Sequence, residues 1–147
     1  MSYQTNISLP KSVFNIGYDS QILSLGSCFS VHIADRLKAL KYSIIQNPCG
    51  ITFNPLSIFS SIKRCISMNS LLEDDLMLSG ALYVHPDFHG SFNNIDPDQY
   101  LKNANNSIMA CHHFLKNVDI VFITIGTAFV YSLKSGNRPV NNCHKLP

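Results

Sequence analysis

The sequence predicts an α/β fold, in which short buried strands form a parallel sheet and amphipathic helices connect them. The first observation is that two apolar runs, Ile22–Leu25 and Ile120–Ile125, have the length and composition of buried parallel strands. The second is that segments with helical periodicity lie between them. The third is composition: 147 residues, 46% hydrophobic and 14% charged, are enough for one globular domain with a sizeable core.

The first strand ends at Gly26-Ser27, and a predicted helix follows it as far as Lys41. Tyr42–Ile45 is a second short strand, and Asn47–Ile51 forms the turn at its carboxyl end. Because the carboxyl ends of parallel strands meet at one edge of a sheet, Ser27 and this turn are expected on the same edge. The helix is expected to bury an apolar stripe: Phe29, Ile33, Leu37 and Leu40.

Two further helices have recognisable starts. Asn54 and Asp96 are predicted N-caps, and a proline follows each at the first helical position. Gln99 stands three residues after Asp96, as in a capping box. The stripes expected to be buried are Leu56, Phe59, Ile62 and Ile66 in the first helix, and Leu101, Ala104, Ile108, Cys111 and Leu115 in the second.

The last predicted strand, Ile120–Ile125, is the most strand-like run and is expected at the centre of the sheet. Gly126–Ala128 follows it and gives a third loop on the same edge. Ala81–Val84 is a further candidate strand, and Glu73–Asp75 is expected in an exposed acidic turn or short helix. The chain is expected to form a single domain, 1–147, with an irregular lead-in over residues 1–20.

Ser27 is the candidate nucleophile. Its place between a strand and a helix puts a hydroxyl at the sheet edge where ligands bind, and at a helix N-terminus that favours developing negative charge. The alternative is that Ser27 is an ordinary N-cap and that Gly26 only eases a tight turn. Cys28 is a second, weaker candidate, since a lone thiol after a strand is more often a small buried hydrophobe.

His85, Asp87 and His89 alternate in the sequence, and on an extended chain they would share one face. Imidazole and carboxylate groups are competent metal ligands. Pro86 and Gly90 disfavour a regular strand, however, and no fourth ligand is evident. The preferred interpretation is a loop that positions substrate or a structural turn, so no metal and no cofactor is predicted.

The formal net charge of +2 comes from 11 basic and 9 acidic residues scattered along the chain, so no nucleic-acid partner or anionic membrane surface is predicted. Five cysteines without a Cys-x-x-Cys motif, and an N-terminus without a signal-peptide pattern, predict reduced thiols in the cytoplasm. No apolar run has the length of a transmembrane helix. The low charged fraction suggests an apolar surface that expects a partner or further sequence.

Four ordered motifs resemble the GSCFA family. Gly26–Ser30 matches its signature at four of five positions, and Ser30 stands where the family has Ala. The second is Asn47–Ile51 with Asn54-Pro55, the third is Asp87–Phe92, and the fourth runs from Gly126 to Lys145. The sequence is therefore identified as a member of this family from the lead-in to the last residue.

The GSCFA domain is similar to the SGNH/GDSL hydrolases, so the resemblance implies a flavodoxin-like three-layer α/β sandwich. It also implies a serine acyl hydrolase or acyltransferase that acts on a small-molecule ester or an acylated sugar. In that scheme Ser27 is the nucleophile, and the backbone of Gly50 donates to the oxyanion hole. Gly126–Ala128 occupies the place of the block that supplies an Asn donor, so Thr127 or Asn142 is the expected substitute.

The general base of SGNH enzymes comes from a late Asp-x-x-His block, which nothing in this sequence matches. Members of the GSCFA family are usually longer, so the sequence is expected to be the N-terminal portion of the domain. His144 and His89 are the candidate stand-in bases, because both are predicted in loops with small or polar neighbours. Two other hypotheses stay open: a non-catalytic module that binds a sugar or acyl ligand, and an inactive truncated fragment. The substrate and the oligomeric state are not predicted.

Overall fold

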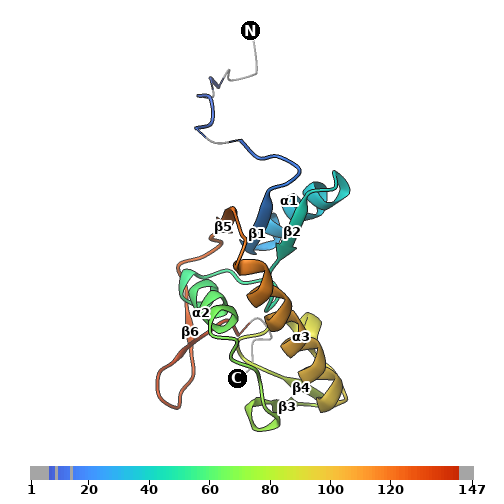
Figure 1. Cartoon of the computed structure of the whole chain (residues 1–147). Helices are drawn as coiled ribbons and strands as arrows, with labels where there is room; N and C mark the ends of the chain where they lie inside the picture. Colours follow the sequence, from blue (N-terminus) through green and yellow to red (C-terminus); the bar gives the residue numbers. More distant parts are fainter. Residues whose placement is uncertain (1–6, 9, 14, 143–147) are drawn as a thin grey trace.

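A parallel sheet forms the centre of the molecule. The computed structural model describes residues 7–8, 10–13 and 15–142, and its sheet has the strand order β2-β1-β5 (Figure 1). The strands are β1 (Gln21–Gly26), β2 (Ser43–Gln46) and β5 (Ile120–Thr124). Both neighbours of β1 run parallel to it, so the predicted α/β fold is confirmed. This order is also that of the first three strands in a flavodoxin-like sheet.

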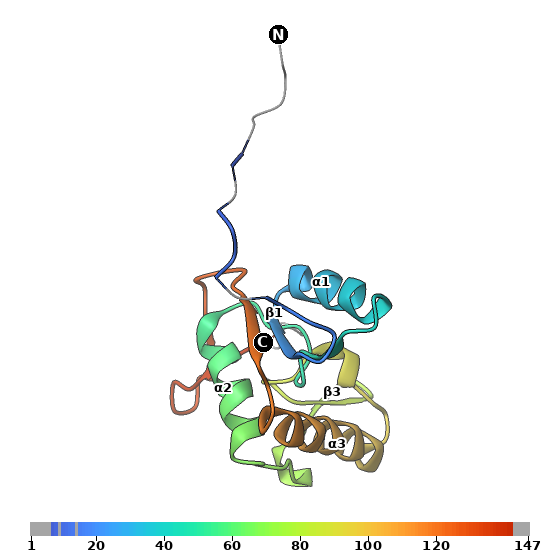
Figure 2. The same cartoon turned by 45° about the horizontal axis from the view of Figure 1, so that its top comes forward.

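Helices cover both faces of the sheet (Figures 1 and 2). They are α1 (Cys28–Ala39), α2 (Pro55–Ile66) and α3 (Pro97–Leu115). Successive side chains of a strand point to opposite faces. On one face Ile22 of β1 packs with Ala34 of α1, and on the other Leu23 packs with residues of α2 and α3. The second face has the larger buried cluster: Leu23, Leu25, Ile58, Cys65 and Cys111.

The predicted starts of α2 and α3 are confirmed. The Asn54 side chain accepts a hydrogen bond from the Ser57 N–H (2.8 Å), and the Asp96 side chain accepts one from the Asp98 N–H (3.0 Å). The predicted capping box is wrong. The Gln99 side chain donates to Asn103 one turn further along the helix, at 2.7 Å, because an amide finds a partner there without reaching back to the cap.

The predicted buried stripe of α1 is wrong for Phe29 and Leu40, whereas Leu37 packs against the core. Phe29 is 60% exposed and Leu40 is 58% exposed, whereas Ser30 and Ala34 face the sheet. Hydrogen bonds explain this orientation of the helix. The Ser30 hydroxyl donates to the Ser27 carbonyl (2.7 Å) and accepts from the Asn47 side chain (3.2 Å). These bonds turn the small side chains of the helix toward the strands.

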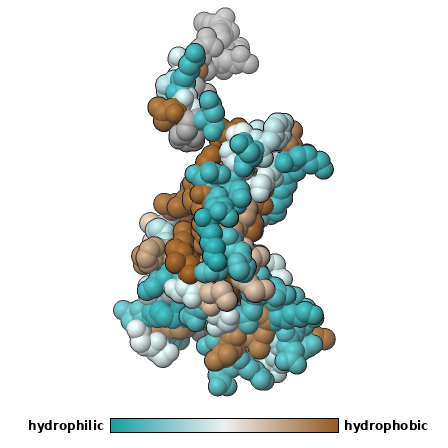
Figure 3. Space-filling model, in the orientation of Figure 1, coloured by the Kyte–Doolittle hydropathy of each residue, from teal (hydrophilic) through white to brown (hydrophobic). Residues whose placement is uncertain are grey.

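The predicted stripe of α2 is also wrong for most of its residues. Leu56, Phe59 and Ile66 are exposed, whereas the residues that α2 buries are Ser57, Ile58, Ser61 and Cys65. Within the described residues, β5 is an edge strand rather than the central one, and Val121 and Ile123 on the α2 face are exposed as well. No strand lies beyond β5 in the described part of the chain, so these apolar side chains of α2 stay exposed. Figure 3 shows the resulting apolar area along β5 and α2.

Two short hairpins and two 3₁₀ turns complete the fold. Ala81–Val84 was expected as a strand, and β4 (Leu82–Val84) confirms it, but its antiparallel partner β3 (Met77–Ser79) has no clear sequence signal. The acidic segment forms the 3₁₀ turn η1 (Glu73–Asp75) as expected. The other elements are the 3₁₀ turn η2 (Gly90–Phe92) and the hairpin of β6 (Tyr131–Ser132) and β7 (Pro139–Val140). In the described part of the chain, no helix has the length and apolarity needed to cross a membrane.

Gly26 is expected to be the least replaceable glycine of the sheet. It has φ +126°, and a Cβ at this position would run into the Thr124 carbonyl oxygen. Gly80 also has positive φ (+62°), but nothing lies within 4 Å of the position of its Cβ. Gly26→Ala should therefore lower the free energy of unfolding by roughly 3 kcal/mol or more, and Gly80→Ala by about 1 kcal/mol. Urea denaturation measures both, and equal losses would contradict the steric argument.

Candidate functional site

Ser27 lies where the ends of two neighbouring strands meet. It is the N-cap residue of α1, but its side chain makes no capping hydrogen bond. Its Oγ lies 3.2 Å from Oγ1 of Thr124, the last residue of β5. The Ser27 N–H donates to the Thr124 carbonyl (3.2 Å) and to Thr124 Oγ1 (3.1 Å). The hydroxyl is therefore half-buried beside β5 and not committed to the helix end.

The Asn47 side chain ties this junction to the turn after β2. Its Oδ1 accepts from the Gly26 N–H (2.8 Å), and its Nδ2 donates to Ser30 Oγ (3.2 Å). Asn47 itself adopts φ +40°, a backbone conformation that asparagine tolerates better than most residues. Neither Asn47 nor Thr124 was singled out in the sequence. The signals for Asn47 are its place before Pro48 at a strand end and its position at the start of the second family-like motif.

Gly50 closes the turn that Asn47 begins. It has φ +81°, and its N–H donates to the Asn47 carbonyl at 2.7 Å. The His89 side chain packs directly against Gly50, since a Cβ there would run into the Cβ of His89. The two residues share a hollow of about 260 Å³ whose lining does not include Ser27. The role of Gly50 as an oxyanion donor stays a prediction, and in this conformation its amide hydrogen is bonded within the turn.

His89 caps the η2 turn. Its Nδ1 accepts from the Ser91 N–H and lies 3.1 Å from Ser91 Oγ, so the hydrogen-bond pattern assigns the proton of the neutral ring to Nε2. A ring in this tautomer donates through Nε2 and does not accept there.

No base is bonded to the nucleophile in the described part of the chain. The side-chain hydroxyl of Ser27 bonds to Thr124 alone among the residues that the structure describes. His144, the other candidate base, lies outside the described residues.

The third loop contacts Ser27 directly. A Cβ on Gly126 would lie 3.3 Å from the Cβ of Ser27, and the N–H groups of Gly126 and Thr127 donate to the Phe53 carbonyl (2.8 and 3.1 Å). Thr127 and Asn142 line the same hollow of about 170 Å³. The structure thus brings together the two residues suggested as substitutes for the missing Asn donor, next to the loop that touches Ser27. Their roles stay predictions.

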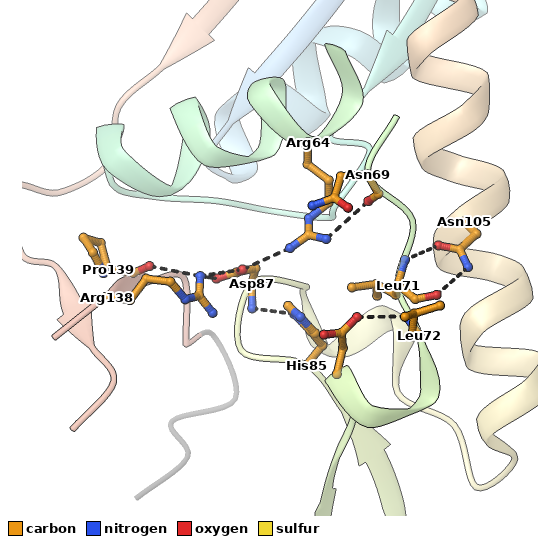
Figure 4. Close-up of polar contacts among 10 residues, drawn as sticks. Arg64, Asn69, Leu71, Leu72, His85, Asp87, Asn105, Arg138 and Pro139 are labelled. Atoms are coloured by element: carbon orange, nitrogen blue, oxygen red, sulfur yellow. Dashed lines mark hydrogen bonds and ion pairs between the residues drawn. The ribbon is translucent and has the colours of Figure 1, made fainter. Parts of the chain in front are cut away.

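Asp87 does not join its neighbouring histidines in a ligand set. Its carboxylate bonds to Arg138 Nη1 (2.8 and 3.0 Å) and to Arg64 Nη2 (3.4 Å), as Figure 4 shows. His85 is buried, and its Nδ1 accepts from the Asp87 N–H at 3.0 Å. This cluster joins α2 to the β6–β7 hairpin. Over the described ranges, no three His, Cys, Asp or Glu side chains are arranged to hold a metal ion.

Three free thiols from distant parts of the sequence lie together in the core. Cys49 follows β2, Cys65 lies in the last turn of α2 and Cys111 lies on α3, and all three are buried. Hydrogen bonds to Cys111 and Cys49, together with burial, raise the pKa of the Cys65 thiol. Cys28, beside Ser27, is exposed rather than buried.

The family comparison agrees with the motifs. Residues 21–147 match the model of the GSCFA family, as the resemblance predicted. Comparisons with curated proteins and with solved structures gave no match.

Burial makes His85 a source of acid sensitivity. It is 5% exposed, and desolvation lowers its pKa from 6.5 to about 4. The unfolded chain therefore binds more protons than the folded one between these pH values, so the stabilising contribution is complete above pH 6.5 and is lost as pH falls toward 4. The loss amounts to about 3 kcal/mol in full. Urea denaturation of the wild type from pH 7 to 4.5 should show this decline.

His85→Asn keeps a side-chain acceptor for the Asp87 N–H and removes the titrating ring. Its free energy of unfolding should decline less over the same pH range. The exposed His32 on α1 provides the matched control, His32→Asn, which should keep the wild-type decline. A decline in His85→Asn as steep as that of the wild type would assign the acid sensitivity to other groups.

The thiols should also differ in reactivity. Iodoacetamide should alkylate Cys28 in the folded protein, because it is exposed. Cys49, Cys65 and Cys111 should react only after denaturation, because their sulfur atoms are buried. Peptide mass mapping with and without urea measures this difference. Rapid alkylation of Cys65 without urea would show that the interface of α2 with α3 opens under native conditions.

Proposed function

The chain belongs to the GSCFA family, and on this premise we propose that it is a serine acyl hydrolase or acyltransferase whose nucleophile is Ser27. The observation that carries the proposal is the state of the Ser27 hydroxyl. It stands at the carboxyl edge of a parallel sheet and at the N-terminus of a 12-residue helix, with no capping bond of its own. Ligands of open α/β sheets bind at this edge, and the helix dipole favours negative charge there.

In the proposed reaction, Ser27 Oγ attacks the carbonyl carbon of an ester, and its proton passes to a base. The tetrahedral intermediate then expels the alcohol and leaves an acyl group on Ser27. Attack by water releases a carboxylic acid, and attack by a second alcohol completes an acyl transfer. A positioned base contributes roughly 10²–10⁴-fold to such a step. His144 and His89 are the candidates within this chain, but His89 could accept a proton only in the other tautomer or after releasing its bonds to Ser91. A histidine from further sequence is the third candidate.

Thr124 gives Ser27 a defined orientation in this proposal. Its Oγ1 accepts from the Ser27 N–H, so its own hydroxyl hydrogen is available to donate to Ser27 Oγ, 3.2 Å away. A bond in that direction leaves the Ser27 proton free to point toward a base. Thr124 is therefore proposed as a positioning residue rather than a catalytic one.

A non-catalytic binding module is the second candidate. The observation that favours it is that two backbone groups near the nucleophile are bonded within the protein: the Ser27 N–H to Thr124, and the Gly50 N–H, the predicted oxyanion donor, to Asn47. An oxyanion would have to displace these bonds or use Thr127 and Asn142.

The free thiols support the proposed cytoplasmic location, because reduced cysteines are the rule there.

Labelling with a fluorophosphonate followed by peptide mapping tests the proposed nucleophile. With the full-length gene product, the expected adduct lies on Ser27, and Ser27→Ala abolishes it. Thr124→Val keeps the shape of the side chain but removes its hydroxyl, so it should slow labelling by roughly tenfold. Ser79→Ala, an exposed serine on β3, is the control and should label at the wild-type rate.

A folded protein that takes up no probe would contradict the hydrolase proposal. The fold is checked in the same sample by a cooperative urea transition. That outcome would favour the binding module, because the site geometry would then exist without an activated serine.

A further inference from the structure

The turn after β2 and the end of α2 are both held against α3, and each carries a buried thiol. The Ser107 hydroxyl of α3 donates to the Pro48 carbonyl at 2.7 Å, which fixes the turn and its Cys49 on this helix. Further along α3, the His112 ring lies 3.0 Å from the Cys65 carbonyl in the last turn of α2. These two contacts place Cys49 and Cys65 beside the same stretch of α3.

Cys65 is the centre of the thiol group. Its side chain is hydrogen-bonded to Cys49 and to Cys111, and it shares a buried cluster with Cys111. A thiol has one hydrogen, so Cys65 donates to one of its two neighbours at a time. Sulfur atoms in such contact are close to the geometry that a disulfide requires.

Cys49 has the surroundings of a reactive thiol. The hydrogen bond from Cys65 lowers its pKa, burial opposes this effect, and a hydrogen bond with Ser61 and the charge of Arg64 lower the pKa further. For Cys111, by contrast, burial and Cys49 both oppose ionisation. The thiolate is the form of cysteine that attacks an oxidant. Cys49 is therefore the better nucleophile, and Cys65 is the neighbour that keeps its proton.

Both thiols are buried, so an oxidant reaches them only when the structure opens locally. Arg64, which acts on Cys49, is 17% exposed and lines a polar hollow of about 160 Å³ at the surface. Hydrogen peroxide is little larger than a water molecule and smaller than iodoacetamide, so a smaller opening admits it. Oxidation is expected to be slower at Cys49 than at the exposed Cys28.

We propose that Cys49 and Cys65 form a redox modification site, in which hydrogen peroxide converts the two thiols into an intrachain disulfide. The Cys49 thiolate attacks the peroxide: an S–O bond forms, the O–O bond breaks, and the departing hydroxide takes up a proton. The Cys65 sulfur then attacks the Cys49 sulfur. An S–S bond replaces the S–O bond, and the Cys65 proton leaves with hydroxide as water. Two thiols and one peroxide molecule thus become one disulfide and two water molecules.

This disulfide would tie α2 to the turn that also carries Asn47 and Gly50. Asn47 accepts from the Gly26 N–H, so the modified turn is one hydrogen bond away from the end of β1. The inference concerns a different chemistry from the proposed hydrolase and does not rest on it.

Peptide mapping gives the first test. The protein is the full-length gene product with Cys28→Ser, which removes the exposed thiol. It is treated with hydrogen peroxide at neutral pH, quenched in acid with a maleimide and digested with trypsin. The three buried cysteines fall in different tryptic peptides, 42–63, 65–102 and 103–116. The expected product joins 42–63 to 65–102 and separates again on reduction.

Three further substitutions identify the groups that act. Arg64→Gln removes the positive charge near Cys49, so the second-order rate constant of disulfide formation should fall several-fold. Lys63→Gln, an exposed neighbour on the same helix, is the matched control and should oxidise at the parent rate. Cys111→Ala should still form the bridge between Cys49 and Cys65. A cooperative urea transition of each reduced variant checks the fold.

The proposal is overturned if the folded protein leaves 42–63 and 65–102 unlinked, or if peroxide joins 65–102 to 103–116 instead. Equal rates for Arg64→Gln and Lys63→Gln would also overturn it, because the reactivity of Cys49 would then have another origin. Fluorophosphonate labelling of Ser27 is measured separately, so the failure of either proposal leaves the other standing.

Discussion

The carboxyl end of β1 is held from both sides, and the rest of the site depends on this constraint. Asn47 after β2 accepts from the Gly26 N–H, and the Thr52 N–H donates to the Gly26 carbonyl at 3.0 Å. From the other side, the Thr124 carbonyl accepts from the Ser27 N–H. Only a residue without Cβ lets Thr124 approach this closely. Ser27 is thus positioned by two neighbouring strands before any helix residue contributes.

The local parts of the fold could be predicted from the sequence because their signals are local. Asn54 and Asp96 cap their helices through bonds that span two or three residues, and Ile120–Thr124 has strand composition throughout. The buried stripe of α3 was predicted correctly at Ala104, Ile108 and Cys111, but the buried faces of α1 and α2 could not be predicted in the same way. Apolar periodicity marks Phe29 and Phe59 for burial, yet which face turns inward depends on what the sheet offers, and that is a property of the whole chain.

The candidate site could also be predicted only in its local features. Strand ends followed by small residues predict that Ser27, Gly50 and Thr127 share one edge, and the topology of the sheet agrees with this. The contacts that give these residues their chemistry join positions far apart in sequence. The Ser27–Thr124 pair spans 97 residues, and the Gly26–Asn47 bond spans 21. No sequence spacing encodes such pairs, so they become visible only when the strands are in register.

The unpaired side of β5 has a consequence for handling the protein. Between Asp119 and Lys134 no residue is charged, and Val121 and Ile123 are exposed on the same strand. Natural edge strands are commonly protected by lysines, prolines or bulges, which keep a foreign strand from pairing with the free N–H and C=O groups. Within the described residues, the outer edge of β5 has no lysine, proline or bulge to protect it. Self-association of the described unit should therefore grow with protein concentration and start at this strand, while the sheet edge that carries Ser27 stays intact.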